Sequence, residues 1–290
     1  MPPWSQAELI HKIKSARTAS HSLPRGHLLG TRGQGRSVHT SRSSGPKQIV
    51  ARPAKPKFCP MVLKRVASKV EDISNVGEFL RMVSPVSVDT QDSAGVLSRL
   101  YRRGSGEKVL IFSDMNSQGQ KVWEADGSEK FHNHHLPTGD EGVWFLPQPV
   151  TGEFHANPRL DGKLSRRSEE AVTSWRYLVL ESDEAEADDW LRCLIQIPLR
   201  IACICESGGR SIHALVRLDA ESKVAWDALV HRVKPALVTL GADPGALSAV
   251  RLTRLPQARR GKRVQRLLYL NPFPDGTPIV RRGNPTGGTS

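Results

Sequence analysis

Residues 176–220, RYLVLESDEAEADDWLRCLIQIPLRIACICESGGRSIHALVRLDA, decide the fold of this chain. Two mostly apolar runs, 176–182 and 200–207, have the length of buried strands. Between them, 186–197 has the composition and length of a helix. A third strand-like run, 211–218, follows directly after a Gly-Gly-Arg turn, which indicates a hairpin. The stretch therefore predicts the order β-α-β-β.

The flanking sequence completes this pattern. Downstream, 222–241 has an apolar stripe at helical spacing that ends at a glycine, and 264–272 is a late strand. The order β-α-β-β-α-β predicts an α+β fold, with helices packed on a mixed or antiparallel sheet. Further elements are expected upstream: helices at 70–83 and 92–103, and strands at 107–114 and 121–127.

The positive charge of the chain is concentrated near residue 1. The formal net charge is +13, and residues 1–60 contain eleven Lys or Arg against the single acid Glu8, which gives +10. Residues 1–57 are rich in Ser, Arg, Gly and Pro, and we expect a disordered basic tail because so little apolar surface is available for burial. The composition is typical of a segment that contacts nucleic-acid phosphates, but a solvated arm or an organellar transit peptide also fits.

The rest of the chain is expected to form a folded domain over 61–290. Its expected parts are an N-terminal α/β part (61–141), a core that carries the motifs (142–272) and a flexible C-terminus (273–290). No apolar run is long enough to cross a bilayer, so we expect no membrane partner and a cytoplasmic location. Four cysteines without CxxC spacing predict buried thiols rather than a zinc site or a disulfide framework.

Two acids end the first strand of the decisive stretch. Glu181 and Asp183 are two positions apart, so on a strand they would point to the same side. Two neighbouring carboxylates repel each other unless a cation lies between them, and their oxygens are suitable ligands for a divalent metal ion. The alternative is a strand end that runs into an acidic, solvated helix start, because four more acids follow between 184 and 189.

The Gly-Gly-Arg turn has features of a phosphate site. Gly208 and Gly209 allow backbone conformations that expose amide N–H groups. Ser211 and His213 would share one face of the following strand, beside Arg210 in the turn. A hydroxyl, an imidazole and a guanidinium in this arrangement suit a triphosphate. The alternative is an ordinary hairpin turn with a half-exposed histidine.

A third candidate group follows the long helix. Arg251 and Arg254 could both bind phosphate oxygens or stack on a base. Asp243 lies in the turn GADPG and is the only acid between Asp227 and Asp275, which makes it the natural third carboxylate. A purely structural turn aspartate is an equal alternative.

The order of these groups resembles the catalytic motifs of the archaeo-eukaryotic primase superfamily, which are an acidic pair, an SxH motif and a later acidic motif. The corresponding residues are, in order, Glu181-Ser182-Asp183, Ser211-Ile212-His213, and Asp243 with Arg251 and Arg254. The strings WRYLVLESD, LGADPGALSAVRLTRLP and QRLLYLNP look most like primase-polymerase domains of phages, plasmids and other mobile elements. The resemblance covers about 142–272. It departs from the superfamily at Glu181, where Asp is usual, and at Arg210, where Lys is more familiar.

This resemblance implies an RRM-like sheet and metal-dependent, template-directed nucleotide polymerisation in DNA replication. The implied catalytic residues are Glu181, Asp183, His213 and Asp243. The three acids would hold two Mg²⁺ or Mn²⁺ ions. The implied nucleotide-binding residues are Arg210, Ser211, His213, Arg251 and Arg254.

The partners implied are a single-stranded DNA template, NTP or dNTP and, because the chain has no P-loop motif, a separate helicase. One alternative is a catalytically weakened, primase-like DNA-binding replication factor. Another is a different metal-dependent nucleotidyltransferase or a nuclease on a similar sheet.

Overall fold

The computed structural model describes residues 55–102, 104–114, 121–124 and 136–280. These residues all belong to one compact unit, which spans 53–290. The predictions about the basic tail and about the last ten residues therefore concern segments that lie, apart from 55–57, outside the described residues.

The decisive stretch provides three strands of a four-stranded antiparallel sheet, here called the main sheet. Its strand order is β12 (Leu267–Leu270), β7 (Ile201–Glu206), β8 (Ile212–Ala220) and β6 (Trp175–Glu181). β8 lies between the parallel strands β6 and β7, and β7 lies between β8 and β12. Each β-α-β unit is thus split by an antiparallel strand, and the predicted α+β class is confirmed.

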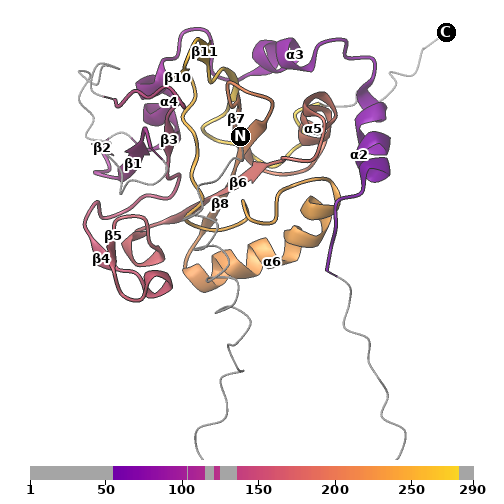
Figure 1. Cartoon of the computed structure of the whole chain (residues 1–290). Helices are drawn as coiled ribbons and strands as arrows, with labels where there is room; N and C mark the ends of the chain where they lie inside the picture. Colours follow the sequence, from indigo (N-terminus) through magenta and orange to yellow (C-terminus); the bar gives the residue numbers. More distant parts are fainter. Residues whose placement is uncertain (1–54, 103, 115–120, 125–135, 281–290) are drawn as a thin grey trace, which may run out of the picture. The chain divides into compact units, whose positions relative to one another are not determined.

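Helices cover one face of the main sheet. They are α2 (Pro60–Ala67), α3 (Val76–Val83), α5 (Ala187–Leu194) and α6 (Lys223–Thr239). Alternation along β6 turns Leu178 and Leu180 toward the core that these helices share, while Tyr177 and Val179 face the opposite side. Figure 1 shows α2 and α5 on this side and α6 along β8.

The helix expected over 70–83 is shorter than predicted. It begins at Val76, because the Asn75 side chain accepts a hydrogen bond from the Glu78 N–H at 3.0 Å and caps the first turn. The preceding residues form a 3₁₀ turn, η1 (Ser68–Val70). α2 was not predicted, and only two of its eight residues, Leu63 and Ala67, are buried.

A second sheet packs on the other face of the main sheet. Its strand order is β2 (Lys121–Glu124), β1 (Lys108–Phe112), β3 (Trp144–Phe145) and β9 (Thr253–Arg254), and α4 (Ser93–Leu100) lies beside it. The core between the two sheets joins Val109, Ile111 and Phe145 to Tyr177 and Val179. Because β9 comes from the segment after α6, this sheet carries the Arg251–Arg254 region to the face of the main sheet that bears Glu181.

Short elements complete the chain. They are β4 (His155–Ala156), β5 (Leu164–Ser165), η3 (Pro158–Leu160), η4 (Glu169–Ala171), β10 (Arg259–Arg260) and β11 (Arg263–Val264). The sequence predicts a flexible C-terminus from 273, whereas residues 273–280 pack against the domain. Val280 N–H donates to the Ile195 carbonyl at 3.0 Å, and Arg200 Nε donates to that of Pro274 at 3.0 Å.

Two predictions from composition can be compared with the structure. Cys193, Cys203 and Cys205 are buried, as expected for structural thiols, and burial raises the pKa of Cys193 and Cys205 to about 12. Among the described residues, no helix has both the length and the apolar character needed to cross a membrane.

Candidate active site between the two sheets

Glu181 and His213 form the centre of the candidate site. The antiparallel register of β6 and β8 places them directly opposite each other. The His213 Nδ1 atom lies 3.2 Å from Glu181 Oε2, and the two side chains are only 9% and 7% exposed. Burial of a carboxylate without polar partners is unfavourable in free energy, and the register of the two strands supplies such a partner for Glu181. The first two sequence motifs thus meet on one face.

His213 is neutral in this environment. Burial, together with the nearby cations Arg254 and Arg260, lowers the pKa of His213 to about 3. The Nδ1 atom lies 3.2 Å from Glu181 Oε2 and 3.1 Å from Thr253 Oγ1, so these two oxygens position the imidazole ring. Nδ1 either donates its proton to one of these oxygens or accepts from the Thr253 hydroxyl.

Arg251 joins the third motif to the first. Its Nη2 donates to Glu181 Oε1 and lies 3.6 Å from Asp243 Oδ2. The Asp243 backbone N–H also donates to the Glu181 carbonyl at 2.9 Å, which ties the GADPG turn to the end of β6. Burial lowers the pKa of Arg251, and its Nε is buried with no hydrogen-bond partner in the described part of the chain. One guanidinium thus serves two carboxylates.

The expected set of three metal-binding acids is not assembled in this structure. Asp183 is exposed, two residues past the end of the strand, and its side chain forms no hydrogen bond or ion pair with the described residues. Within those residues, no three His, Cys, Asp or Glu side chains are grouped closely enough to hold a metal ion. Glu181 and Asp243 nevertheless converge on one cation, the Arg251 guanidinium. Two such oxygen donors suit a divalent ion, provided that Arg251 moves away.

The Gly-Gly-Arg turn is covered by Arg260. Arg260 Nη1 donates to the Ser207 carbonyl at 3.2 Å, and a Cβ at Gly209 would lie 2.8 Å from that nitrogen. The Gly209 N–H already donates to Ser207 Oγ at 3.2 Å. The glycines therefore make room for Arg260, and the Gly209 amide is not free to cradle a phosphate as predicted.

The other two residues of this motif lie nearer to solvent. Ser211 is half-buried, and its hydroxyl makes no hydrogen bond with the described residues. Arg210 is exposed and forms no ion pair with them. Both side chains are available to a ligand.

Arg254 closes one side of the site. Its guanidinium lies 3.9 Å from the centre of the Trp144 ring, and Nη1 donates to the Glu141 carbonyl at 2.6 Å. Burial, and then the charge of Arg260, lowers the pKa of Arg254 to about 10. The crevice between Arg254 and His213 has no room for a water molecule. A ligand group could enter this crevice only if residues that line it, such as Arg254, moved.

Sequence reasoning missed Thr253 and Arg260 as neighbours of His213. Thr253 lies in a strand of only two residues, which is too short for a periodic pattern to have identified it. Of the arginines that precede the acidic strand, Arg167 lies behind Arg251 and donates from Nε to the Val250 carbonyl at 3.1 Å. Arg176 instead forms a half-buried ion pair with Glu107.

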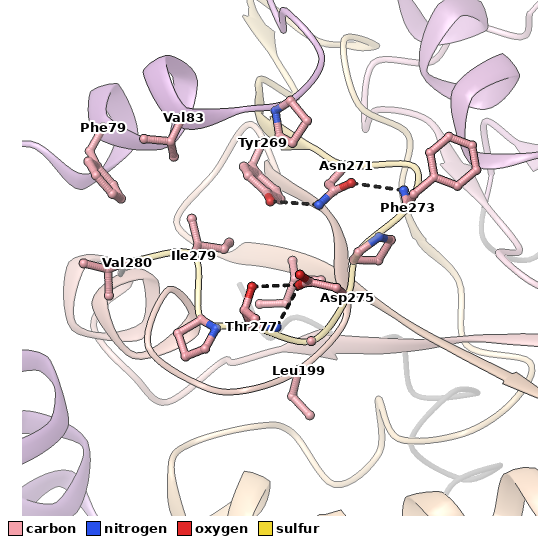
Figure 2. Close-up of a pocket in the computed structure, with 15 residues that line it drawn as sticks. Phe79, Val83, Leu199, Tyr269, Asn271, Phe273, Asp275, Thr277, Ile279 and Val280 are labelled. Carbon is pink, nitrogen blue, oxygen red and sulfur yellow. Dashed lines mark hydrogen bonds between the residues drawn. The ribbon is translucent and has the colours of Figure 1, made fainter. Parts of the chain in front are cut away.

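A separate pocket lies at the other end of β7 (Figure 2). Its volume is about 500 Å³, and its lining includes Phe79, Leu199, Tyr269 and Ile279. Figure 2 shows Asn271 bonded to Tyr269 and Thr277 bonded to Asp275 on its rim. β7 begins at this pocket and ends beside His213, so the pocket is distinct from the candidate site.

Comparison with protein-family models finds no match, and comparison with curated proteins finds none either. Among solved structures, the AEP domain of the cyanophage S-2L primase-polymerase (PrimPol) is similar, with a TM-score of 0.35 and 19% sequence identity. The match covers 58% of this chain and 84% of that chain. A likeness with such a TM-score carries no argument about function, so the function must be inferred from the geometry of the site.

Proposed function

We propose that the chain is a metal-dependent nucleotidyltransferase of the primase type, which joins NTP or dNTP on a single-stranded DNA template. The observation that carries the proposal is the set of contacts around Glu181. His213 from the second sequence motif and Arg251 from the third both bind this one carboxylate. Three groups that are far apart in the sequence thus share one site. The RRM-like identity of the main sheet is part of the same proposal.

Donors around the site are suited to a triphosphate. Phosphate oxygens only accept hydrogen bonds, and guanidinium groups can donate two in parallel. Arg251 and Arg254 flank Thr253 at the site, and the Ser211 hydroxyl has no partner among the described residues. His213 Nδ1 lies 3.2 Å from Glu181 Oε2, so the role of His213 in this proposal is to hold that carboxylate in place.

Arg251 couples phosphate binding to the acids. If the triphosphate draws its guanidinium away, Glu181 and Asp243 lose their shared cation, and a buried carboxylate without a partner is unfavourable. Glu181 would then be the principal ligand of Mg²⁺ or Mn²⁺, with Asp243 as a weaker, non-essential ligand and Asp183 nearby in sequence. Such an ion neutralises phosphate charge and activates the attacking hydroxyl.

Primer extension on single-stranded DNA tests the proposal, with NTP and dNTP compared in Mg²⁺ and in Mn²⁺. We expect incorporation by the wild-type chain, and a loss of at least about 100-fold in Glu181→Gln and Asp183→Ala, as is typical when a group that stabilises transition-state charge is removed. DNA binding by these variants should stay within about twofold of wild type, since neither side chain is basic. Full turnover in Glu181→Gln would refute the assignment.

A second candidate is a DNA-binding replication factor with weakened catalysis. It is favoured by the ion pair of Arg251 with Glu181 and by the closed crevice beside His213. In that case the wild-type chain would bind single-stranded DNA but incorporate no nucleotide with either metal.

A further inference from the structure

A short hairpin next to the site presents a group of cations. β10 and β11 pair antiparallel, with Arg260 opposite Arg263, and Gly261 and Lys262 form the turn. Gly261 has a φ of 55°, the left-handed conformation that a two-residue hairpin turn requires. We call residues 259–264, with the sequence RRGKRV, the basic hairpin. Four of its six residues are Lys or Arg.

The base of the basic hairpin is held firmly. Gln265 is fully buried, and its Nε2 donates to the carbonyls of Val143 and Leu255 at 2.8 and 2.7 Å. Its backbone N–H donates to the Ala258 carbonyl at 2.8 Å, and its own carbonyl accepts from the Gln257 N–H at 2.6 Å. The cations are therefore carried on a fixed support, which lowers the entropy lost when a ligand binds.

The charges of the basic hairpin are not balanced within the described protein. Arg259, Lys262 and Arg263 are exposed and form no ion pair with any residue that the structure describes. The acids Asp140 and Glu141 occur nearby, yet neither pairs with these cations.

Other arginines do have acidic partners: Arg81, Arg159, Arg176, Arg192, Arg200, Arg217 and Arg266. Unpaired cations such as Lys64, Arg65 and Arg232 also occur on α2 and α6. The hairpin differs because two of its cations are paired with each other across the strands. Arg260 opposite Arg263 is a like-charge cross-strand pair, which destabilises a sheet. Fold stability does not account for this arrangement, whereas an external anion would.

The cations continue from the hairpin into the candidate site. Arg260 packs on the Gly208–Gly209 turn, next to the exposed Arg210. Arg260 and Arg254 also lie beside each other, because a Cβ at Gly142 would be 3.3 Å from Arg260 Cγ and 2.6 Å from Arg254 Nη1. One phosphate group engages only two or three such donors, so a series of this length suits a ligand with many phosphates.

We propose that the basic hairpin binds the phosphate backbone of a single nucleic-acid strand beside the candidate active site. The choice of a nucleic acid as the partner rests on the proposed function, but binding can be measured without nucleotide or metal. The hairpin would position the strand without reading its sequence, as backbone contacts do.

The test is the salt dependence of DNA binding by the full chain. Affinity for a labelled dT20 oligonucleotide is measured in EDTA from low to moderate salt, for wild type and for the combined variant Arg259→Gln/Lys262→Gln/Arg263→Gln. Each lost phosphate contact reduces the slope of log affinity against log salt by about 0.7 for single strands, so a decrease of about 2 is expected. At ~0.1 M salt this corresponds to a roughly ten- to hundred-fold weaker affinity.

A matched control removes three cations elsewhere, in Lys64→Gln/Arg65→Gln/Arg232→Gln on α2 and α6, which cover the opposite face of the main sheet. We expect its slope to equal that of wild type. An unchanged slope in the hairpin variant, or an equal decrease in the control, would overturn the inference.

A second probe is a vesicle of anionic phospholipid. If the hairpin variant loses affinity for the vesicles but not for DNA, the hairpin binds a membrane surface instead, and the proposal is overturned. If the hairpin variant loses DNA affinity while even the wild-type chain incorporates no nucleotide, the hairpin inference stands and the proposed function fails.

Discussion

Arg251 is the residue on which the charge balance of the site depends. It contacts Glu181 and lies 3.6 Å from Asp243, and its guanidinium stays protonated even where burial lowers its pKa. A lysine could neutralise the same charge but could not present parallel donors to a phosphate. The identity of this residue therefore matters to nucleotide use in a way that its charge alone does not.

We predict that Arg251→Ala weakens nucleotide use more than Asp243→Ala does. A charge-assisted hydrogen bond contributes roughly 1.5–3 kcal/mol, which is about a ten- to hundred-fold loss of kcat/KM. Arg251→Lys should fall between wild type and Arg251→Ala. Steady-state kinetics with varied nucleotide measure the order. A nearly silent Arg251→Ala beside an inactive Asp243→Ala would reverse it and make Asp243 an essential metal ligand.

We predict that Gly142→Ala destabilises the fold by about 1–3 kcal/mol, because the added methyl overfills the core. Its Cβ would lie 2.1 Å from Gln265 Oε1 and 2.6 Å from Arg254 Nη1, at a φ of 100°. Gly104→Ala is the matched control, since it has a φ of 73° but no neighbour within 4 Å. Urea unfolding of both variants separates the clash from the backbone strain. Equal losses would show that the packing around Gly142 is not tight.

At the scale of elements, local pattern predicted some strands well and others not at all. β6, β7 and β8 have six to nine residues of continuous apolar or alternating character, and each was expected within one or two residues of its observed bounds. β3 and β9 have two residues each, too few for any period. Their pairing of Trp144 with Arg254 also joins distant parts of the chain, which no local pattern encodes.

The two sheets are joined by the ion pair of Glu107 and Arg176, whose side chains are 16% and 14% exposed. Burial alone would raise the pKa of Glu107, but the hydrogen bonds and charge of Arg176 outweigh it, so the pKa is lowered from 4.5. A carboxylate whose pKa is lower in the folded state than in the unfolded state stabilises the fold at pH values above its unfolded-state pKa. This stabilisation is lost as the pH falls through the folded-state pKa.

We therefore predict that Glu107→Gln destabilises the protein by about 1–3 kcal/mol at pH 7, between the values for an exposed and a fully buried ion pair. The difference from wild type should narrow as the pH falls below about 4.5. Glu169→Gln, which removes the partner of the exposed Arg159, is the control and should cost less than about 1 kcal/mol. Unfolding curves at several pH values provide the measurement. If the difference in unfolding free energy between wild type and Glu107→Gln stays constant down to pH 3, the predicted coupling between Glu107 protonation and stability is wrong.

At the scale of the whole molecule, part of the candidate site could be predicted from the sequence. Strand alternation brought Glu181 and His213 to one face, as their pairing shows. Asp183 was expected beside them, but β6 ends at Glu181, and alternation no longer applies beyond a strand end. The position of Arg251 between two acids depends on how the chain folds back after α6, which is a tertiary feature. The sequence did not indicate the basic hairpin as a binding surface, because that role depends on the residues that lie next to the hairpin in the fold.

Charge is divided unequally along the molecule, and this division leads to a prediction about DNA binding. Residues 1–57 contain all eleven of the Lys and Arg residues found before residue 60 and only one acid. Deletion of 1–57 keeps Cys59, whose N–H donates to the Thr239 carbonyl at 3.0 Å and ties the start of α2 to α6. The remaining domain should therefore keep its fold.

We predict that deletion of residues 1–57 leaves nucleotide incorporation intact but flattens the salt dependence of DNA binding. Each phosphate that the tail neutralises adds about 0.7 to the slope of log affinity against log salt for a single strand. The tail and the basic hairpin share no residues, so their effects on the slope should add. Fluorescence titrations of the full chain, the deletion, the hairpin variant and their combination measure this. If the deletion leaves the slope unchanged, the tail does not contact DNA, and the basic residues of the folded domain must account for all of the electrostatic binding.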